Sequence, residues 1–321
     1  MNVRKVLKWI VLVPGALFVL FSLLPYLIPE PRESGNRHQL SFANSEYAEV
    51  GGVELHYRSW EGSNQGSVNM LLVHGLGGST FSWRYTAPAL ESEGYRVVAV
   101  DLPGFGLSER RQGLDHTAPA RAGRLWVFLD ERYPGEQWNL VGHSMGGAVV
   151  TAMALQEPQK VKSITLVAGA LAESEPSFFN SFLHYPPVSR WIRILGPGFL
   201  RSESRLEQVL ASAYGREPSI DETAGYYRPL AVENTAAVLV DLLKTSPVSL
   251  VDRLDELALP VLCVWGVEDT WVPLEQGERL LQLIPRSRLV AIEGEGHCPM
   301  ETSPEQFNAI LADFLVGLDS P

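Results

Sequence analysis

Cysteine is scarce in this sequence: Cys263 and Cys298 are the two among 321 residues. Two cysteines exclude a disulfide framework and supply no spaced set of metal ligands. Basic residues are also outnumbered, because 26 Lys and Arg face 37 Asp and Glu for a formal net charge of −11. No cluster of Lys and Arg follows the first few residues, so the chain lacks the basic stripe that neutralises nucleic-acid phosphates. We expect no nucleic-acid partner, no metal and no cofactor.

Apolar residues are plentiful enough for a large core. They make up 45% of the chain, against 20% charged residues. A chain of this length and composition can form one large domain, or one domain that carries an insertion. A globular enzyme is therefore permitted.

The first thirty residues differ from the rest. Residues 9–28 carry no charge, and roughly 20 apolar residues are enough to cross the hydrocarbon layer of a membrane. Arg4, Lys5 and Lys8 precede this run, and the positive-inside rule keeps such residues in the cytoplasm. We therefore predict a transmembrane helix as an N-terminal membrane anchor, in a single-pass protein whose catalytic domain lies on the non-cytoplasmic side.

Two alternatives to that anchor stay open. A cleaved signal peptide is one, but no small-x-small cleavage site follows the apolar run. A hydrophobic hairpin in one leaflet is the other, because Pro14 and Pro25 would kink a helix. The predicted organisation is an anchor in residues 1–28, a polar stalk in 29–44, a core in 45–170 and 248–321, and an insertion in 171–247.

Short apolar runs rich in Val, Leu and Ile recur along the core. Continuous rather than alternating apolarity is typical of strands covered on both faces. Gly51-Gly52 lies between the first two runs and supplies the positive φ of a tight hairpin. The predicted strands are residues 47–50, 53–57, 70–73, 97–100, 138–141, 164–167, 261–265 and 289–292.

Helical patterns alternate with these runs, at residues 118–131, 145–156, 275–283 and 304–315. Alternation of strand and helix predicts an α/β fold, with a mostly parallel sheet and helices on both faces. The alternation stops in residues 171–247, where aromatic residues and leucines mix with charges at helical spacing. We interpret this segment as a helical insertion.

The clearest chemical signal is a Gly-x-Ser-x-Gly motif in residues 142–146, at the end of a predicted strand and directly before a predicted helix. This is the pattern of a nucleophile elbow, which raises a serine hydroxyl above the strand ends. The positive end of the following helix favours developing negative charge at the hydroxyl. Ser144 is therefore the candidate nucleophile.

A serine hydroxyl needs a base to take its proton. Among seven histidines, His297 fits best, because it lies in a Gly-rich loop after a predicted strand and before the last helix. His143 adjoins Ser144 and His74 ends a strand, and we interpret both as structural. The other four histidines lie in no motif.

The base in turn needs a carboxylate that holds its tautomer. Asp269 follows the predicted strand 261–265 and gives the chain order serine, acid, histidine that is expected of this arrangement. Glu268 is the rival. The loop after strand 164–167 contains no acid, which favours Asp269. Two backbone N–H groups for the oxyanion are expected from Leu76, in the His-Gly segment 74–78, and from Met145.

Together with the motif Asp-Leu-Pro-Gly-Phe-Gly-Leu-Ser at residues 101–108, these segments resemble the α/β-hydrolase fold family. The resemblance covers roughly residue 46 to the C-terminus, and its motifs occur in the right order on the right elements. It implies a mostly parallel eight-stranded sheet, a structural role for Asp101, and a helical cap between the sixth and seventh strands at residues 171–247.

The predicted function is hydrolysis of carboxylic esters through an acyl-enzyme on Ser144. Aromatic residues of the insertion can line an apolar cleft, so Phe178, Phe182 and Trp191 are candidate contacts for an apolar or lipid-like ester. Packing of the insertion's own helices explains most such residues. Carbon–carbon bond hydrolysis, haloperoxidase-like chemistry and peptide cleavage are the alternatives, and a non-catalytic binding protein is a further one.

Overall fold

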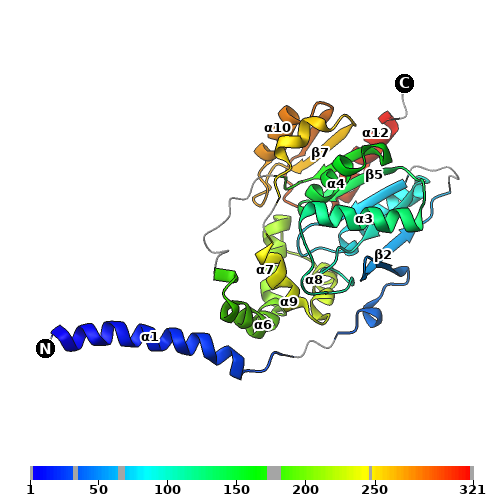
Figure 1. The fold of residues 1–321 in the computed structure, drawn as a ribbon. Helices are drawn as coiled ribbons and strands as arrows, with labels where there is room; N and C mark the ends of the chain where they lie inside the picture. The colour runs from blue at the N-terminus through cyan, green and yellow to red at the C-terminus, as the bar shows by residue number, and fades with distance from the viewer. Residues whose placement is uncertain (1–2, 32–34, 64–68, 172–181, 246–247, 319–321) are drawn as a thin grey trace.

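The computed structural model describes residues 3–31, 35–63, 69–171, 182–245 and 248–318 (Figure 1). Its centre is one eight-stranded sheet in the order β1-β2-β4-β3-β5-β6-β7-β8. Every predicted strand lies within an observed one. The strands are β1 (Ser45–Val50), β2 (Val53–Trp60), β3 (Asn69–Val73), β4 (Arg96–Val100), β5 (Trp138–His143), β6 (Val161–Val167), β7 (Val261–Gly266) and β8 (Ser287–Ile292).

The sheet is mostly parallel, as predicted. β1 pairs with β2 and β2 with β4 in antiparallel fashion, and the strands from β4 to β8 are all parallel. Gly51 and Gly52, with φ of 58° and 80°, form the turn of the β1–β2 hairpin. Because parallel strands share one direction, the carboxyl ends of β3, β5, β6, β7 and β8 meet at one edge of the sheet, where the loops that follow them lie together.

Helices surround this sheet and also precede and interrupt it. The α-helices are α1 (Val3–Leu27), α2 (Thr86–Ser92), α3 (Ala118–Arg132), α4 (Met145–Gln156), α6 (Pro186–Leu200), α7 (Glu203–Tyr214), α8 (Ile220–Tyr227), α9 (Thr235–Lys244), α10 (Leu274–Leu283), α11 (Pro299–Thr302) and α12 (Pro304–Leu318). Short 3₁₀ helices are η1 (Arg37–Leu40), η2 (Thr80–Trp83), η3 (Pro158–Lys160), η4 (Arg228–Ala231) and η5 (Val251–Glu256).

The core lies on both faces of the sheet. Side chains of β3 alternate between two buried clusters: Leu71 and Val73 pack with α3, α4 and α10, whereas Met70 and Leu72 pack with α2 and α12. Successive strand residues point to opposite faces, so a strand covered on both sides is apolar at most positions. This explains the continuous apolar runs of the sequence.

Helices α6 to α9 lie between β6 and β7 in the chain and form one group beside the sheet (Figure 1). This is the position expected for the insertion. Its predicted limit at residue 171 adjoins residues outside the described ranges, and its limit at 247 lies among them. The division into core, stalk and cap therefore stays a prediction.

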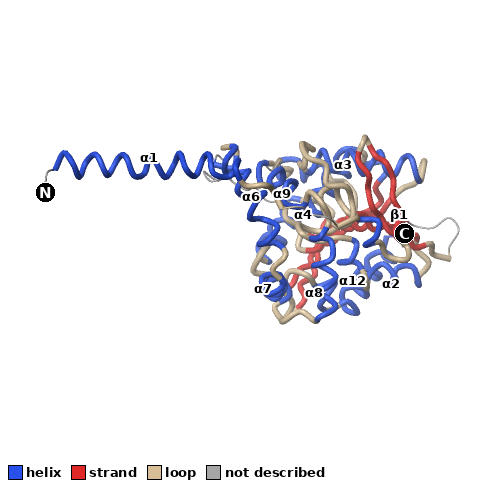
Figure 2. Tube along the Cα trace, turned by 90° about the horizontal axis from the view of Figure 1, so that it is seen from below, coloured by secondary structure: helices blue, strands red, loops and turns tan. Residues whose placement is uncertain are grey.

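Helix α1 projects from the rest of the molecule (Figure 2), and its C-terminal half contacts α6. The Ser22 hydroxyl lies 2.7 Å from the Tyr185 hydroxyl. The indole N–H of Trp191 donates to the Phe21 carbonyl at 3.0 Å, and the rings of these two residues stack at 6.1 Å. Part of the apolar run thus packs against another helix of the same chain.

The predicted transmembrane anchor is wrong. Over the described residues, no helix has both the length and the apolar character that crossing a bilayer demands. The single-pass localisation, with a cytoplasmic N-terminus and an outward catalytic domain, fails with it. The physical reason for the error is that hydropathy reports apolar side chains without specifying what they contact. Here the helix contains Pro14 and Pro25, and part of it lies against α6.

Candidate active site

Ser144 occupies the sharp turn between β5 and α4. Its φ of 49° and ψ of −117° lie in a region that L-residues rarely adopt, at a cost of about 1–3 kcal/mol. Backbone bonds hold this conformation: the Ser144 N–H donates to Val167 O at 2.9 Å, and its carbonyl accepts from Gly147 and Ala170 at 2.9 and 3.0 Å. The observed strand, turn and helix are the context that the motif requires.

The two glycines of the motif are required by close packing. A Cβ on Gly142 would lie 2.5 Å from Gly146 O, and a Cβ on Gly146 would lie 2.4 Å from Val73 O. Both distances are far below a van der Waals contact. The neighbouring atoms belong to the backbone, which has no room to move. The motif thus fixes the turn at Ser144 against strand β3.

His297 lies in the loop between β8 and α11 and is 3% exposed. Its backbone N–H donates to Ala213 O of α7 at 2.7 Å, and its ring stacks on Trp271 with centroids 5.4 Å apart. The ring Nδ1 is 2.8 Å from Oδ2 of Asp269. Because a carboxylate accepts, Nδ1 carries the proton, and Nε2 is left as the basic nitrogen.

Asp269, rather than Glu268, is the carboxylate that contacts this ring. It follows β7 and is 5% exposed, and its second oxygen accepts the N–H groups of Trp271 and Val272 at 2.8 and 2.9 Å. Glu268 is exposed. The loop therefore presents one of its two acids to the imidazole and the other to solvent.

Ser144 and His297 both line one cavity of about 400 Å³. This volume lies within the range of about 300–1,000 Å³ found for small-molecule sites. The wall is largely apolar. It consists of Gly75, Leu76, Gly77, Gly78, Ser82, His143, Ser144, Phe199, Leu200, Arg205, Leu206, Val209, Leu210, Ala213, Tyr226, Leu230, Trp271, Val272, His297 and Cys298.

The predicted oxyanion donors flank the nucleophile. Leu76 lines the cavity, and within the described part of the chain its N–H donates no hydrogen bond. Met145 is the first residue of α4, where a helical N–H has no acceptor inside the helix. Both groups can therefore donate to a bound oxygen. Their role as a pair stays a prediction.

The two histidines that we interpreted as structural make hydrogen bonds that fit this role. His143 Nε2 lies 3.0 Å from His297 O, and burial lowers the pKa of His143 well below its ordinary value. His74 accepts the Leu102 N–H at 3.0 Å and donates to Gly75 O at 2.7 Å. Neutral imidazoles thus support the loops around the cavity.

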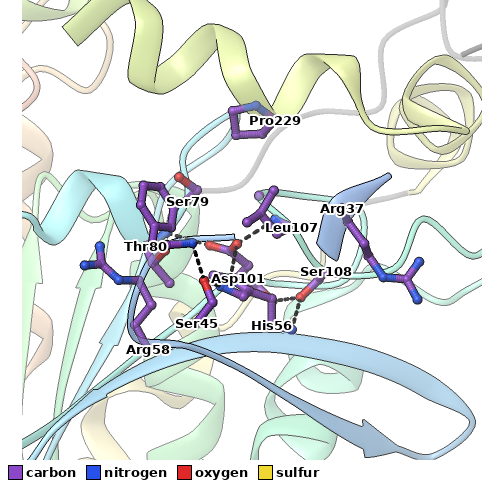
Figure 3. Close-up of polar contacts among 12 residues, drawn as sticks. Arg37, Ser45, His56, Arg58, Ser79, Thr80, Asp101, Leu107, Ser108 and Pro229 are labelled. Carbon is purple, nitrogen blue, oxygen red and sulfur yellow. Dashed lines mark hydrogen bonds and ion pairs between the residues drawn. The ribbon is translucent and has the colours of Figure 1, made fainter. Parts of the chain in front are cut away.

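A second serine, histidine and aspartate lie in line elsewhere in the molecule (Figure 3). His56 Nδ1 is 2.6 Å from Asp101 Oδ2, and His56 Nε2 is 2.7 Å from Ser45 Oγ. Asp101 also accepts the N–H groups of Thr80 and Leu107, each at 2.6 Å. Burial by itself raises the pKa of Asp101, but His56, His74 and the Leu107 N–H outweigh burial and hold it below its ordinary value.

This second set connects backbone segments and does not face the cavity. Ser45 belongs to the regular strand β1, and its hydroxyl already accepts the Phe42 N–H at 2.8 Å. It does not line the cavity that holds Ser144. Asp101 starts the 101–108 turn, and its contacts agree with the structural role that the resemblance implied.

Of the three substrate contacts predicted in the insertion, the two that the structure describes do not line the cavity. Phe178 lies outside the described residues. Phe182 is 51% exposed and does not line the cavity, and Trp191 packs on α1 instead. Among the insertion residues that do line it, most belong to α7, where Leu206, Val209, Leu210 and Ala213 share one face. Their i, i+3, i+4, i+7 spacing was the signal available in the sequence.

Helices α7 and α8 are joined to the core by a buried polar cluster. Glu301 of α11 accepts from the Tyr214 hydroxyl at 2.8 Å, from the Tyr226 hydroxyl at 2.5 Å, and from the Arg84 guanidinium. Tyr226 also lies 2.9 Å from the Ser82 hydroxyl on the cavity wall. Burial raises the pKa of Glu301 despite the adjacent Arg84. This cluster fixes the insertion over the loop that carries His297.

Comparison with known proteins agrees with this geometry. The model of the alpha/beta hydrolase fold matches residues 68–304. An uncharacterized hydrolase of Bacillus subtilis, YugF, is 31% identical over 83% of this chain and 96% of its own length. A pimeloyl-[acyl-carrier protein] methyl ester esterase of Aeromonas hydrophila is 32% identical over 77% of this chain and 95% of its own. The chain belongs to the α/β-hydrolase fold family.

Solved structures share the fold at lower identity. A membrane phospholipase A described as a bacterial virulence factor superposes with a TM-score of 0.71, at 23% identity, over 99% of this chain and 100% of its own. An esterase of Thermogutta terrifontis gives 0.69, at 24% identity, over 87% and 100%. Hydrolysis is the class of activity that the fold and the named relatives support.

Proposed function

We propose that this protein is a serine hydrolase that cleaves carboxylic esters of apolar or lipid-like acids. The observation that carries the proposal is that Ser144, in its strained turn, and His297, bonded to Asp269, line the same cavity. The wall of that cavity is mainly Leu, Val, Phe and Gly. Such a wall suits a substrate whose acyl group is apolar next to the scissile ester better than one whose acyl group is charged there.

The reaction proceeds in two halves. Ser144 Oγ attacks the ester carbonyl carbon while His297 Nε2 takes the hydroxyl proton. The carbonyl oxygen becomes an oxyanion and accepts from the N–H groups of Leu76 and Met145. Collapse breaks the bond to the alkoxy group, which leaves as the alcohol with the proton from His297. The acyl group stays on Ser144.

Water completes the cycle. His297 takes a proton from a water molecule, whose oxygen attacks the acyl carbon and forms a second oxyanion. Collapse breaks the bond to Ser144 Oγ, which regains its proton from His297, and the carboxylic acid leaves. Asp269 stabilises the imidazolium in both halves without taking a proton itself.

A graded series of p-nitrophenyl esters tests the proposal. We expect kcat/KM to rise from acetate toward medium-chain esters, and Ser144→Ala and His297→Gln each to lower turnover by about 10⁴ to 10⁶. Hydrolysis that persists in Ser144→Ala at the wild-type rate would refute the mechanism. A flat chain-length series would refute the apolar preference alone.

Carbon–carbon bond hydrolysis is the second candidate. A protein of Paraburkholderia phymatum named 2-hydroxy-6-oxononadienedioate/2-hydroxy-6-oxononatrienedioate hydrolase is 30% identical over 85% of this chain and 96% of its own. A vinylogous 2-hydroxy-6-oxo-dienoate and a matched ester, assayed with the same wild-type preparation, separate the two. Preference for the dienoate in kcat/KM would favour the second candidate.

A further inference from the structure

One cavity residue carries a full charge. Among the residues that line the cavity in the described part of the chain, Arg205 is the single Lys, Arg, Asp or Glu. It belongs to the first turn of α7 and directly precedes Leu206, the first residue of the apolar face that α7 turns to the cavity. A cation thus stands at the side of a pocket that is otherwise apolar or uncharged, apart from its histidines.

Arg205 has no counter-ion among the described residues. None of its four helical neighbours is acidic: Arg201 and Ser202 precede it, and Gln208 and Val209 follow it. These are the positions that a helical side chain can reach. No ion pair or side-chain hydrogen bond of Arg205 occurs within the described ranges. Arg84, whose partner Glu301 also bonds the cavity residue Tyr226, is by contrast paired with Glu301 and Glu222.

Arg205 is exposed, and its guanidinium lies over one aromatic ring, Phe199, which is 60% exposed. The guanidinium carbon lies 4.3 Å from the centroid of the Phe199 ring, and Phe199 is itself a cavity residue. Stacking on an aromatic face engages the flat side of a guanidinium and leaves its N–H edge free to bond a planar anion in a bidentate manner. The Arg205 guanidinium can thus donate hydrogen bonds, and no side chain among the described residues accepts them.

We infer that Arg205 binds an anionic oxygen group of the substrate, a carboxylate or a phosphate, separate from the ester that Ser144 cleaves. This inference rests on the proposed function and narrows its substrates to amphiphilic esters, with an apolar portion in the cavity and one anionic group at Arg205. Against the formal net charge of −11, Arg205 provides a local positive charge that favours an anionic group at this side of the cavity.

A pair of esters of equal length tests the inference. Monomethyl suberate carries a terminal carboxylate at the position where methyl octanoate has its terminal methyl group. We expect Arg205→Gln to lower kcat/KM for monomethyl suberate relative to methyl octanoate by about twofold to fivefold, the size of one exposed ion pair. Arg205→Lys keeps most of the preference. Raising NaCl to 0.5 M weakens it in the wild type.

Arg279→Gln is the matched control, since Arg279 is an exposed arginine of α10 that does not line the cavity. A ratio that Arg205→Gln leaves unchanged, or that Arg279→Gln lowers equally, overturns the inference while hydrolysis of methyl octanoate still supports the proposed function. Wild-type protein inert toward both esters counts against the proposed function as well. A second pair, 1-octanoylglycerol 3-phosphate and 1-octanoylglycerol, shows whether phosphate or carboxylate is the preferred anion.

Discussion

Oδ2 of Asp269 lies 2.8 Å from Nδ1 of His297, while Oδ1 of the same carboxylate accepts two backbone N–H groups. The carboxylate is thus fixed by its own loop and can hold the imidazole in one tautomer. The adjacent Glu268 is exposed and takes no part in this contact.

Asp269→Asn is therefore expected to lower kcat by about 10³ to 10⁴, because an amide in this place favours the wrong tautomer of His297. Glu268→Gln, which removes the same charge one residue away, is the control and is expected to stay within about twofold. Steady-state ester hydrolysis measures both. The assignment of the acid is wrong if the two variants exchange these phenotypes.

Ser45 and Ser144 allow a comparison within one chain, because Ser45 bonds His56, which bonds Asp101, whereas Ser144 lines the same cavity as His297, which bonds Asp269. Ser45→Ala is expected to keep turnover within about threefold and to lower the free energy of unfolding by about 1–3 kcal/mol, as the loss of its two hydrogen bonds, to His56 and from the Phe42 N–H, predicts. Ser144→Ala is expected to lose turnover and to keep its stability. Parallel denaturant titrations and ester assays measure both effects, and a catalytic loss in Ser45→Ala would show that the buried set has a chemical role.

The cavity wall gives a prediction about chain length. Val209 is 50% exposed and lines the cavity from α7, so Val209→Trp fills part of the space. We expect kcat/KM for dodecanoyl esters to fall about tenfold while that for acetyl esters changes little. Trp191→Ala is the control, since Trp191 contacts α1 rather than the cavity. Equal losses for long and short esters in Val209→Trp would contradict the placement of the acyl chain.

His116 gives a prediction about pH. Burial lowers its pKa to about 4, and neither ring nitrogen has a hydrogen-bond partner in the described ranges. The unfolded chain, with a pKa of about 6.5, takes up a proton between pH 6.5 and 4 that the folded protein does not. Stability from this residue is therefore present above pH 6.5 and falls as the pH decreases.

Urea titrations at pH 7.5 and pH 5.0 measure this contribution. The wild type is expected to lose about 1–2 kcal/mol more between these conditions than His116→Leu, which cannot take up the proton. Wild type and variant that lose equal stability would show that His116 is protonated alike in the folded and unfolded chain.

The strands and the nucleophile turn were predictable from the sequence because each depends on local pattern. Burial on both faces favours the largely apolar runs of β3, β5, β6 and β7, and the motif around Ser144 tolerates no side chain at Gly142 or Gly146. Strand order and the partners of buried polar groups depend on contacts far apart in the chain, and no local pattern encodes them.

The insertion and the N-terminus were harder because their apolar residues have several possible neighbours. Trp191 was expected in the substrate cleft and packs on α1, whereas Leu206 and Leu210 line the cavity. The apolar run of residues 9–28 was expected in lipid, and part of it contacts α6. An apolar side chain is expected to be buried away from water. The tertiary fold determines which surface it packs against.

The nucleophile is tested most directly by covalent labelling. A fluorophosphonate reacts with an activated serine and stays attached, so intact-mass and peptide mapping identify the residue. We predict one adduct per chain on Ser144 in the wild type and in Ser45→Ala, and none in Ser144→Ala or His297→Gln. An adduct on another serine, or wild-type protein that stays unlabelled while it hydrolyses esters, would contradict the account.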